Sequence, residues 1–335
     1  MRAARRSRDF VGVAEAAYRA EPSDQAWLAG VVESLAPVLG DAEGVLGTFV
    51  NAVDHANIEV VAAAAVGASD GVLAASAAMQ EHAGASAAMR ERFLQAGPVS
   101  SLRRTLGRAS PLLADLSHAH GVHDALYVWA GDPVGLLCAF SSPSRRTLPL
   151  PRHHLWSLER VAAHVASGLR LRRCAGRARS GAGHAPDEAV LTPAGDVAHA
   201  TGPAATPGGL AALRRAALRS ERARGPLRRR DADEALALWT ALVRGRWAVV
   251  DHFDSDGRRY LVARRNEPMF GREGRALTRR ERQVASLAAR GHANKLIAYE
   301  LGLSLGTVHT YLARAQGKLG LPTRVHLIRA LLAGC

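Results

Sequence analysis

The C-terminal segment from Leu277 onward carries the pattern that most constrains how this chain can fold. It reads LTRRERQVASLAARGHANKLIAYELGLSLGTVHTYLARAQGKLGLPTRVHLIRALLAG. Thr278 and Glu281 have the spacing of a capping box, in which each side chain accepts a hydrogen bond from the backbone N–H of the other residue. Val284, Leu287 and Ala288 then give one buried face before Gly291 ends the helix. The pattern therefore predicts a short amphipathic helix that begins just after Thr278.

Three further helices are predicted in the same segment. Asn294 is expected to cap the second helix, and Gly302 then turns the chain with Leu303 in the interior of the turn. Ser304 is expected to cap the third helix, over residues 304–319. The fourth is expected over residues 323–332.

The third helix has two different faces. Its predicted inward residues are Val308, Leu312, Ala315 and Leu319, and its predicted outward residues are His309, Thr310, Ala313 and Arg314. Two short helices joined by a tight turn containing Gly, with a polar stripe on the second, form a helix-turn-helix, whose second helix fits the major groove of DNA. The segment resembles the LuxR/FixJ-type DNA-binding domain. The matching residues are Leu277, Thr278, Arg280, Glu281, Val284, Leu287, Gly291, Asn294, Lys295, Ile297, Ala298, Leu301, Ser304, Thr307, Val308, Leu312, Lys318, Leu319, Gly320, Thr323 and Arg324.

The resemblance implies specific roles for residues of this segment. Lys295 would lie beside the DNA phosphate backbone, and Lys318 near the end of the recognition helix. The base-reading positions of the family match His309, Thr310 and Ala313, where a basic residue is common in place of Ala313. The full set of candidate DNA-binding residues is Lys295, Ser304, Thr307, His309, Thr310, Ala313, Arg314 and Lys318.

Charge also favours a nucleic-acid partner. The chain has a net charge of +14, and its two lysines, Lys295 and Lys318, both lie in this segment, while arginine supplies the other 42 cations. Residues 271–335 hold eleven Lys and Arg against three Glu, so +8 of the net charge lies there. Phosphate contacts supply affinity that does not depend on sequence, so this concentration favours DNA over an anionic membrane.

The first 174 residues predict an α+β domain. Helices are expected over residues 26–39, 70–82 and 152–173, and strands over residues 44–52 and 58–66. Two apolar runs around Gly131, Asp132 and Pro133 predict a hairpin over residues 124–144. This order is similar to that of a GAF-type sensory domain, an antiparallel sheet flanked by helices.

A second α+β unit is expected over residues 187–268, after a Gly-, Ala- and Arg-rich linker at 175–186. Short strands flank residues 193–196, and helices are expected over 208–224 and 231–245. Residues 247–253 and 259–265 predict a hairpin. The unit is similar to a PAS-like fold, and a packed extension of the first domain is the alternative.

Three histidines suggest a rival function. His118, His120 and His123 have the HxHxxH spacing of the first metal ligands of metallo-β-lactamase-fold hydrolases, but Val122 stands where that family has Asp. Imidazoles at this spacing in a loop could bind zinc. The alternatives are therefore a metal-dependent hydrolase with an appended DNA-binding domain, or a polar loop before a strand.

The sequence lacks the motifs that mark several other classes of protein. Three distant cysteines give neither a disulfide framework nor a zinc knuckle, and the N-terminus lacks the apolar core of a signal peptide. Phosphate-loop, nucleophile-elbow and dinucleotide-binding motifs are missing, as is a phosphoacceptor receiver pattern. We therefore expect a cytoplasmic protein that is not an enzyme, with no cofactor and no membrane partner.

These patterns predict an α+β sensory region, GAF/PAS-like, followed by an all-α tetrahelical helix-turn-helix domain at residues 269–335. The expected partners are double-stranded DNA, a second copy of the chain, RNA polymerase and a small-molecule effector. The dimer face is expected on the helix at 152–173 or on the fourth C-terminal helix through Val325, Ile328 and Leu332. A degenerate helix-turn-helix that binds another protein instead of DNA is a second rival.

Overall fold

The computed structural model describes residues 8–39, 43–51, 59–85, 89, 92–93, 96–131, 136–179, 187–239, 241–243, 246–253, 257–266, 277–290, 292–319 and 321. The hairpin turn at 132–135, the residues 180–186 of the expected linker and the expected fourth helix at 323–332 lie outside these ranges. Among the described residues, no helix combines the length and apolarity needed to cross a membrane.

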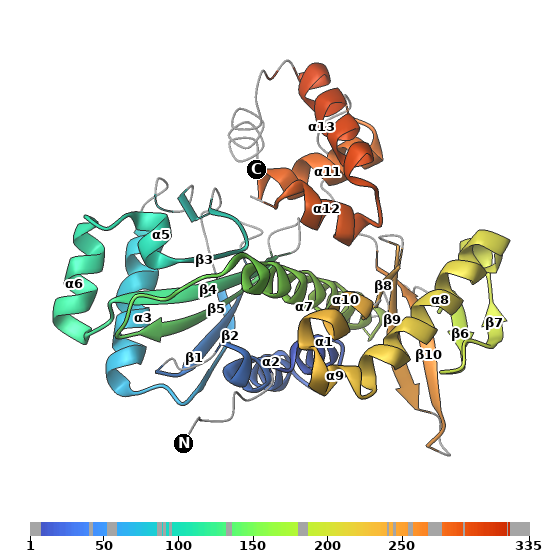
Figure 1. The fold of residues 1–335 in the computed structure, drawn as a ribbon, viewed down its shortest axis with the longest axis horizontal. Coiled ribbons are helices and arrows are strands. Elements are labelled where there is room, and N and C mark those ends of the chain that lie inside the picture. Colours follow the sequence, from blue (N-terminus) through green and yellow to red (C-terminus); the bar gives the residue numbers. More distant parts are fainter. Residues whose placement is uncertain are drawn as a thin grey trace.

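The first sheet has five antiparallel strands in the order β2-β1-β5-β4-β3 (Figure 1). The strands are β1 (Val45–Asn51), β2 (Glu59–Val66), β3 (Val99–Ser101), β4 (Asp124–Gly131) and β5 (Leu136–Ser144). The predicted strands and the predicted hairpin are confirmed. Strand β3 was not anticipated, because three residues are too short to give a periodic signal.

Alternation along β4 divides the side chains between two cores. Leu126, Val128 and Ala130 point into a core with α1 (Phe10–Ala17), α2 (Asp24–Leu39) and α7 (Arg152–Arg179). Tyr127 and Trp129 point to the other face, which is covered by α3 (Asp70–Ala85), α5 (Leu102–Leu106) and α6 (Pro111–His120). The sheet is therefore covered by helices on both faces, as expected for successive side chains that point to opposite sides.

Helix α7 runs from the first sheet to a second one (Figure 1). Leu158, Val161 and Leu169 recur at helical spacing and are at most 1% exposed. Every residue from 160 to 170 is buried. This stretch therefore cannot supply the dimer face expected on the helix at 152–173, because other elements of the same chain cover it.

The second sheet, with the order β7-β6-β10-β9-β8, is also antiparallel. Its strands are β6 (Ala189–Leu191), β7 (Val197–Ala200), β8 (Leu242–Val243), β9 (Trp247–Phe253) and β10 (Arg259–Arg265). One face packs against α8 (Pro207–Arg224), after the 3-10 helix η1 (Gly202–Ala205). The other face contacts Tyr18 of the first unit and Leu171 of α7. Residues 187–266 thus have a core of their own and also pack against the first unit.

Two sequence-based boundaries are wrong in this region. Helix α7 continues to Arg179, into the expected linker, because Ala and Arg at residues 175–179 favour helix despite the one Gly among them. The helix expected over 231–245 is α10 (Ala232–Leu238), which follows the short α9 (Leu227–Arg230) and ends at Leu238. Beyond it, Leu242 pairs with Ala248 in the sheet. That pairing overrides the local helical preference.

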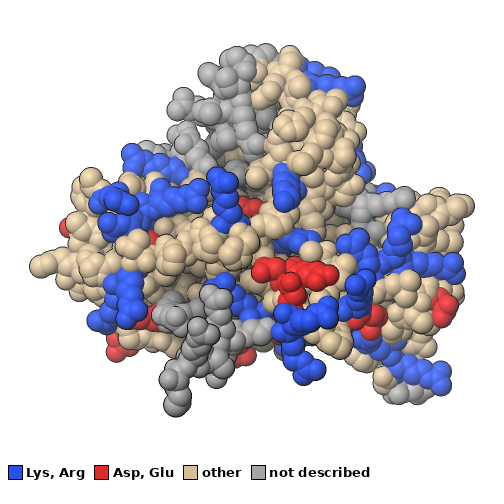
Figure 2. Space-filling view, in the orientation of Figure 1, with Lys and Arg blue, Asp and Glu red and all other residues tan. Residues whose placement is uncertain are grey.

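The C-terminal helices are α11 (Arg279–Ala289), α12 (Asn294–Leu301) and α13 (Leu305–Leu319). They pack around a separate core that includes Val284, Ile297, Leu301, Val308 and Leu312. Helix α12 contacts α7. Basic side chains are spread over the whole face in Figure 2, whereas acidic ones gather in a few places. The positive charge on this face is therefore not confined to the C-terminal helices.

Candidate DNA-binding surface

The first C-terminal helix begins with the predicted capping box. The Thr278 side chain accepts a hydrogen bond from the Glu281 N–H at 3.3 Å, and Glu281 Oε2 accepts one from the Thr278 N–H at 2.8 Å. Two N–H groups that have no partner within the helix are satisfied in this way. The capping box thereby fixes where α11 begins, and α11 packs against the two helices that follow.

The turn between α12 and α13 has the expected geometry. Gly302 takes a left-handed conformation with φ of 61°, which suits a residue without a Cβ. The Leu303 N–H donates to the Ala298 carbonyl at 2.9 Å, and the Leu303 side chain packs against the core. The Ser304 hydroxyl caps α13 by accepting from the Thr307 N–H at 3.1 Å. Together, the left-handed Gly302 and these two hydrogen bonds define the tight turn that links the two helices.

The expected cap of α12 is wrong. Ala293 is the N-cap, with no side-chain cap bond, and Asn294 is already the first helical residue. The Asn294 amide instead lies 3.4 Å from His309 Nε2 on α13. Asparagine favours caps in general, but here its side chain contacts the neighbouring helix. That contact brings the start of α12 against the start of the polar stripe on α13.

Helix α13 carries that polar stripe on its outer face. Val308, Leu312 and Ala315 are buried, as predicted. His309, Thr310, Ala313 and Arg314 are all exposed. The Thr310 hydroxyl donates to the Gly306 carbonyl at 2.9 Å, and the hydroxyls of Ser304 and Thr307 lie 2.8 Å apart. The structure therefore places seven of the eight candidate residues on α13 and its cap, all but Lys295.

Lys318 differs from the residues of the polar stripe because its ammonium is paired with a buried carboxylate. Its Nζ lies 2.7 Å from Glu281 Oε2, and Glu281 is only 3% exposed. The Lys318 ammonium and the Thr278 N–H together lower the pKa of the Glu281 carboxyl to about 2. Lys318 therefore joins the end of α13 to the start of α11, a partnership that the sequence analysis missed although the capping box pointed to Glu281.

Lys295 faces the N-terminal part of the chain. Its Nζ lies 4.5 Å from the ring centroid of Trp156 on α7, within the range of a cation–π interaction. Arg160 lies 4.6 Å from the ring of Tyr299 on α12. The start of α12 is therefore packed against aromatic and cationic side chains of α7 in this arrangement.

A buried histidine completes this contact. His164 is 0% exposed, and its Nε2 shares a hydrogen bond with the Tyr299 hydroxyl at 2.8 Å. Its Nδ1 shares another with the Tyr18 hydroxyl at 3.0 Å. Burial, aided by the nearby Arg160, lowers the pKa of His164 to about 3, so the ring is neutral near pH 7. His164 thus joins three parts of the chain through one uncharged ring.

Comparison with known proteins agrees with this geometry. Residues 275–331 match the family described as bacterial regulatory proteins, luxR family. The C-terminal domain is a LuxR-family domain. It is 52% identical over 58 residues to the transcriptional regulatory protein UhpA of Escherichia coli strain K12, covering 17% of this chain and 30% of that protein. It is 45% identical over 65 residues to the transcriptional regulatory protein FixJ of Azorhizobium caulinodans, covering 19% of this chain and 31% of that protein.

The chain thus spans about a third of the length of the curated relatives it matches. A solved structure titled "SdiA in complex with octanoyl-rac-glycerol" aligns over 96% of this chain and 93% of its own, with 14% identity and a TM-score of 0.33. The sequence similarity to UhpA and FixJ spans 58 to 74 residues of this chain, and the match to the luxR family covers residues 275–331.

The histidine triplet does not form a metal site. His118 and His120 lie in the last turn of α6, not in a loop, and residues two apart on a helix point in nearly opposite directions. His123 Nδ1 lies 3.2 Å from Ser117 Oγ. No group of three or more potential ligands is present in the described part of the chain. The hydrolase alternative to the LuxR-family reading has no support.

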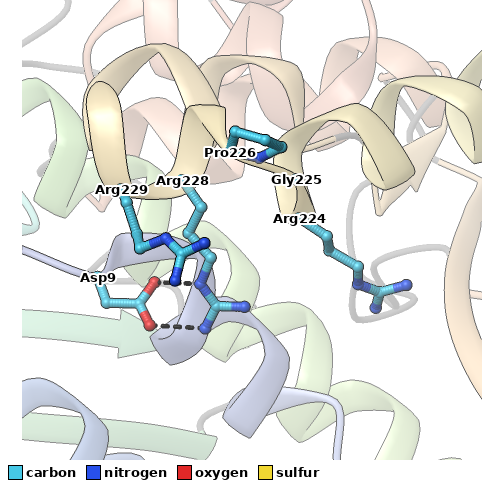
Figure 3. A pocket seen from close by; sticks show the side chains of 6 residues that line it. All are labelled: Asp9, Arg224, Gly225, Pro226, Arg228 and Arg229. Atoms are coloured by element: carbon cyan, nitrogen blue, oxygen red, sulfur yellow. Dashed lines mark hydrogen bonds and ion pairs between the residues drawn. The ribbon is translucent and has the colours of Figure 1, made fainter.

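A hollow of about 550 Å³ lies between α1 and the α8–α9 connection (Figure 3). Arg228 makes a two-pronged contact with Asp9, with Nε at 2.7 Å and Nη2 at 2.6 Å from its carboxylate oxygens. Arg224 pairs with Glu15 at 2.9 Å and Asp251 at 2.5 Å. Carboxylates match these cations, so the cluster joins α1 to the second unit instead of offering an anion site.

Proposed function

We propose that this protein is a transcription regulator that binds double-stranded DNA with α13 in the major groove. The observation that carries the proposal is the exposed stripe of His309, Thr310, Ala313 and Arg314 on the second helix of a helix-turn-helix in a LuxR-family domain. Side chains on such a helix reach base edges, while neighbouring cations and helix starts contact phosphates.

Each candidate residue takes a role from its position. His309 and Thr310 would donate or accept hydrogen bonds at base edges, and the Ala313 methyl would pack against a thymine methyl. Ser304 and Thr307, at the start of α13, would contact phosphate, as would Arg314. Lys318 would act first by holding α11 and α13 together through Glu281. Its ammonium would add to the positive field near the phosphates.

The contact between α12 and α7 supports the proposal that the N-terminal region controls DNA binding. Lys295, a candidate phosphate ligand, lies on Trp156 in this arrangement. The cation–π contact stabilises the docked position of Lys295, so we propose that docking on α7 and DNA binding compete for this side chain. A signal that loosens this contact would raise DNA affinity, because a ligand of one state shifts the population toward that state.

We also propose the division into a sensory unit at 1–174, a connecting segment, a second unit at 187–268 and the DNA-binding domain at 269–335. Dimerisation would involve residues 323–332, where the sequence predicts a fourth helix, since other elements cover the central part of α7. A dimer would bind two half-sites about one helical turn of DNA apart. RNA polymerase is the proposed partner once the protein is bound.

In vitro selection tests the proposal. The full-length chain is incubated with a pool of random DNA duplexes, and the bound fraction is sequenced over several rounds. We expect enrichment of a two-fold symmetric motif that the His309→Ala/Thr310→Ala variant fails to enrich. A matched control, His118→Ala/His123→Ala, removes two exposed polar groups from the first unit and should enrich the same motif. Binding without any enriched motif would contradict a sequence-specific regulator.

A further inference from the structure

A hollow of about 380 Å³ lies where the sensory units meet the LuxR-family domain. Its lining includes Arg160 of α7, Arg215 and Arg219 of α8, Trp239 just after α10, and Tyr299 of α12, with alanines between them. Figure 1 shows the elements that supply this lining, with α12 above α10 and α8 beside it. Its volume falls within the range of about 300–1,000 Å³ that is usual for small-molecule sites.

The charged side chains that line this hollow are all positive. Three arginines line it, and no Asp or Glu is among the described residues that do so. Arg215 and Arg219 are exposed at its rim. This differs from the hollow of Figure 3, where carboxylates neutralise the arginines. An anion that entered between α8 and α12 would therefore meet cations with no competing acidic side chain on the wall.

Two buried donors at this hollow have no hydrogen-bond partner among the residues that the structure describes. Arg160 is 8% exposed, and its Nε has no hydrogen-bond partner within the described structure, although its Nη2 donates to the Ala237 carbonyl at 3.2 Å. Trp239 is 3% exposed, and its Nε1 is likewise without a partner there. Buried donors cost free energy when unpaired, so they are rarely left so without a compensating role.

Aromatic and apolar groups form the rest of the wall. Trp239 and Tyr299 present large rings, and Ala212, Ala216 and Ala298 leave room between the helices. Guanidinium groups bind carboxylates and phosphates through two parallel hydrogen bonds. The combination suits a molecule with an oxyanion at one end and a flat apolar body at the other.

We infer that this hollow is a binding site for a small organic anion, a carboxylate or phosphate on an apolar body. Its wall shares Arg160 and Tyr299 with the contact that holds α12 on α7. An occupant would therefore change the free energy of docking of the DNA-binding helices. This regulatory consequence rests on the proposed function, whereas binding itself does not.

Calorimetric titration of the full-length chain with phenyl phosphate, and separately with benzoate, tests the site. We expect saturable binding of one molecule per chain for at least one of these probes, and weaker binding of inorganic phosphate, which lacks the apolar body. Benzyl alcohol, which lacks the charge, should not bind. Absence of saturable binding of both organic anions up to about 10 mM, equivalent to an affinity weaker than millimolar, would overturn the proposal.

Paired variants place the binding in this hollow. Arg215→Ala/Arg219→Ala removes the two rim cations and should weaken binding at least tenfold. Arg214→Ala/Arg222→Ala removes two other exposed arginines of the same helix, which do not line the hollow, and should leave binding within twofold. Equal losses in the two pairs would show non-specific attraction to a basic helix and would overturn the assignment.

Measuring DNA affinity with and without the bound probe distinguishes binding at this hollow from its coupling to DNA binding. A change of fivefold or more that is lost in Arg215→Ala/Arg219→Ala supports the coupling. Probe binding with unaltered DNA affinity would overturn the coupling and leave the site intact. Probe binding by a chain that binds no DNA would contradict the proposed function alone.

Discussion

Removal of one hydroxyl should loosen the DNA-binding domain from α7. Tyr299 shares its hydroxyl with Nε2 of His164, which is 0% exposed. Tyr299→Phe keeps the ring and its packing but leaves that nitrogen buried without a partner. An unsatisfied buried group costs about 1–3 kcal/mol. The docking equilibrium should therefore shift by about 5- to 150-fold toward the released state.

Hydrogen exchange of the full-length chain, followed by mass spectrometry, measures this shift. The amides of α12 and of the facing part of α7 should exchange faster in Tyr299→Phe, with α11 little changed. Tyr311→Phe is the matched control, because Tyr311 is half-buried on α13 and makes no hydrogen bond through its hydroxyl to the described residues. Equal exchange of the α12 amides in the wild type and both variants would show that the Tyr299 hydroxyl does not stabilise the docking of α12 on α7.

Three further predictions follow from neighbouring contacts. Trp156→Ala removes a cation–π partner worth about 0.5–1 kcal/mol and should raise DNA affinity about two- to fivefold in a fluorescence-anisotropy titration, whereas lower affinity would contradict competition for the α12 lysine. Stability should be full above about pH 6.5 and fall as the pH drops toward 3, because His164 is neutral in the fold with a pKa of about 3 and takes up a proton once unfolded. The pH profile of urea unfolding midpoints should flatten in His164→Ala, and an unchanged profile would show that another group is responsible. Arg314→Ala should lower the salt slope of DNA binding by about one with the urea midpoint unchanged. Lys318→Ala should instead lower the midpoint by leaving Glu281 without its cation, and the reverse pattern would contradict these roles.

The C-terminal helices were predictable because their signals are local. The capping box at Thr278, the left-handed Gly302 and the Ser304 cap each depend on residues a few positions apart, and all three are found in the structure. Asn294 failed as a cap because its side chain contacts His309, which is a tertiary effect. The exposed face of α13 followed directly from helical periodicity.

The contacts that connect the parts of the chain were not predictable from local pattern. His164 meets Tyr18 and Tyr299, which are 146 and 135 positions away in the sequence. The positions of these residues in the sequence do not predict that their side chains form hydrogen bonds. His118 and His120 were expected in a loop because the helical spacing of Leu112, Leu113 and Leu116, which bury one face of α6, was overlooked.

The second sheet illustrates an intermediate case. Its central hairpin was predicted with the correct bounds, because Gly257 and alternating residues mark it clearly. The end of α10 was not, because pairing of Leu242 with Ala248 depends on a strand that comes later in the chain. Local preference therefore gave the start of the helix, near residue 231, but not its end.

The central claim is that His309 and Thr310 on α13 read DNA sequence. The most direct test measures the affinity of the wild type and of His309→Ala/Thr310→Ala for the selected duplex and for a scrambled duplex, over a range of salt concentrations. We expect the wild type to prefer the selected duplex by about 10³-fold or more, and the variant to lose most of this preference but keep its salt slope. Equal affinity of the wild type for both duplexes, or an unaltered preference in the variant, would contradict that claim.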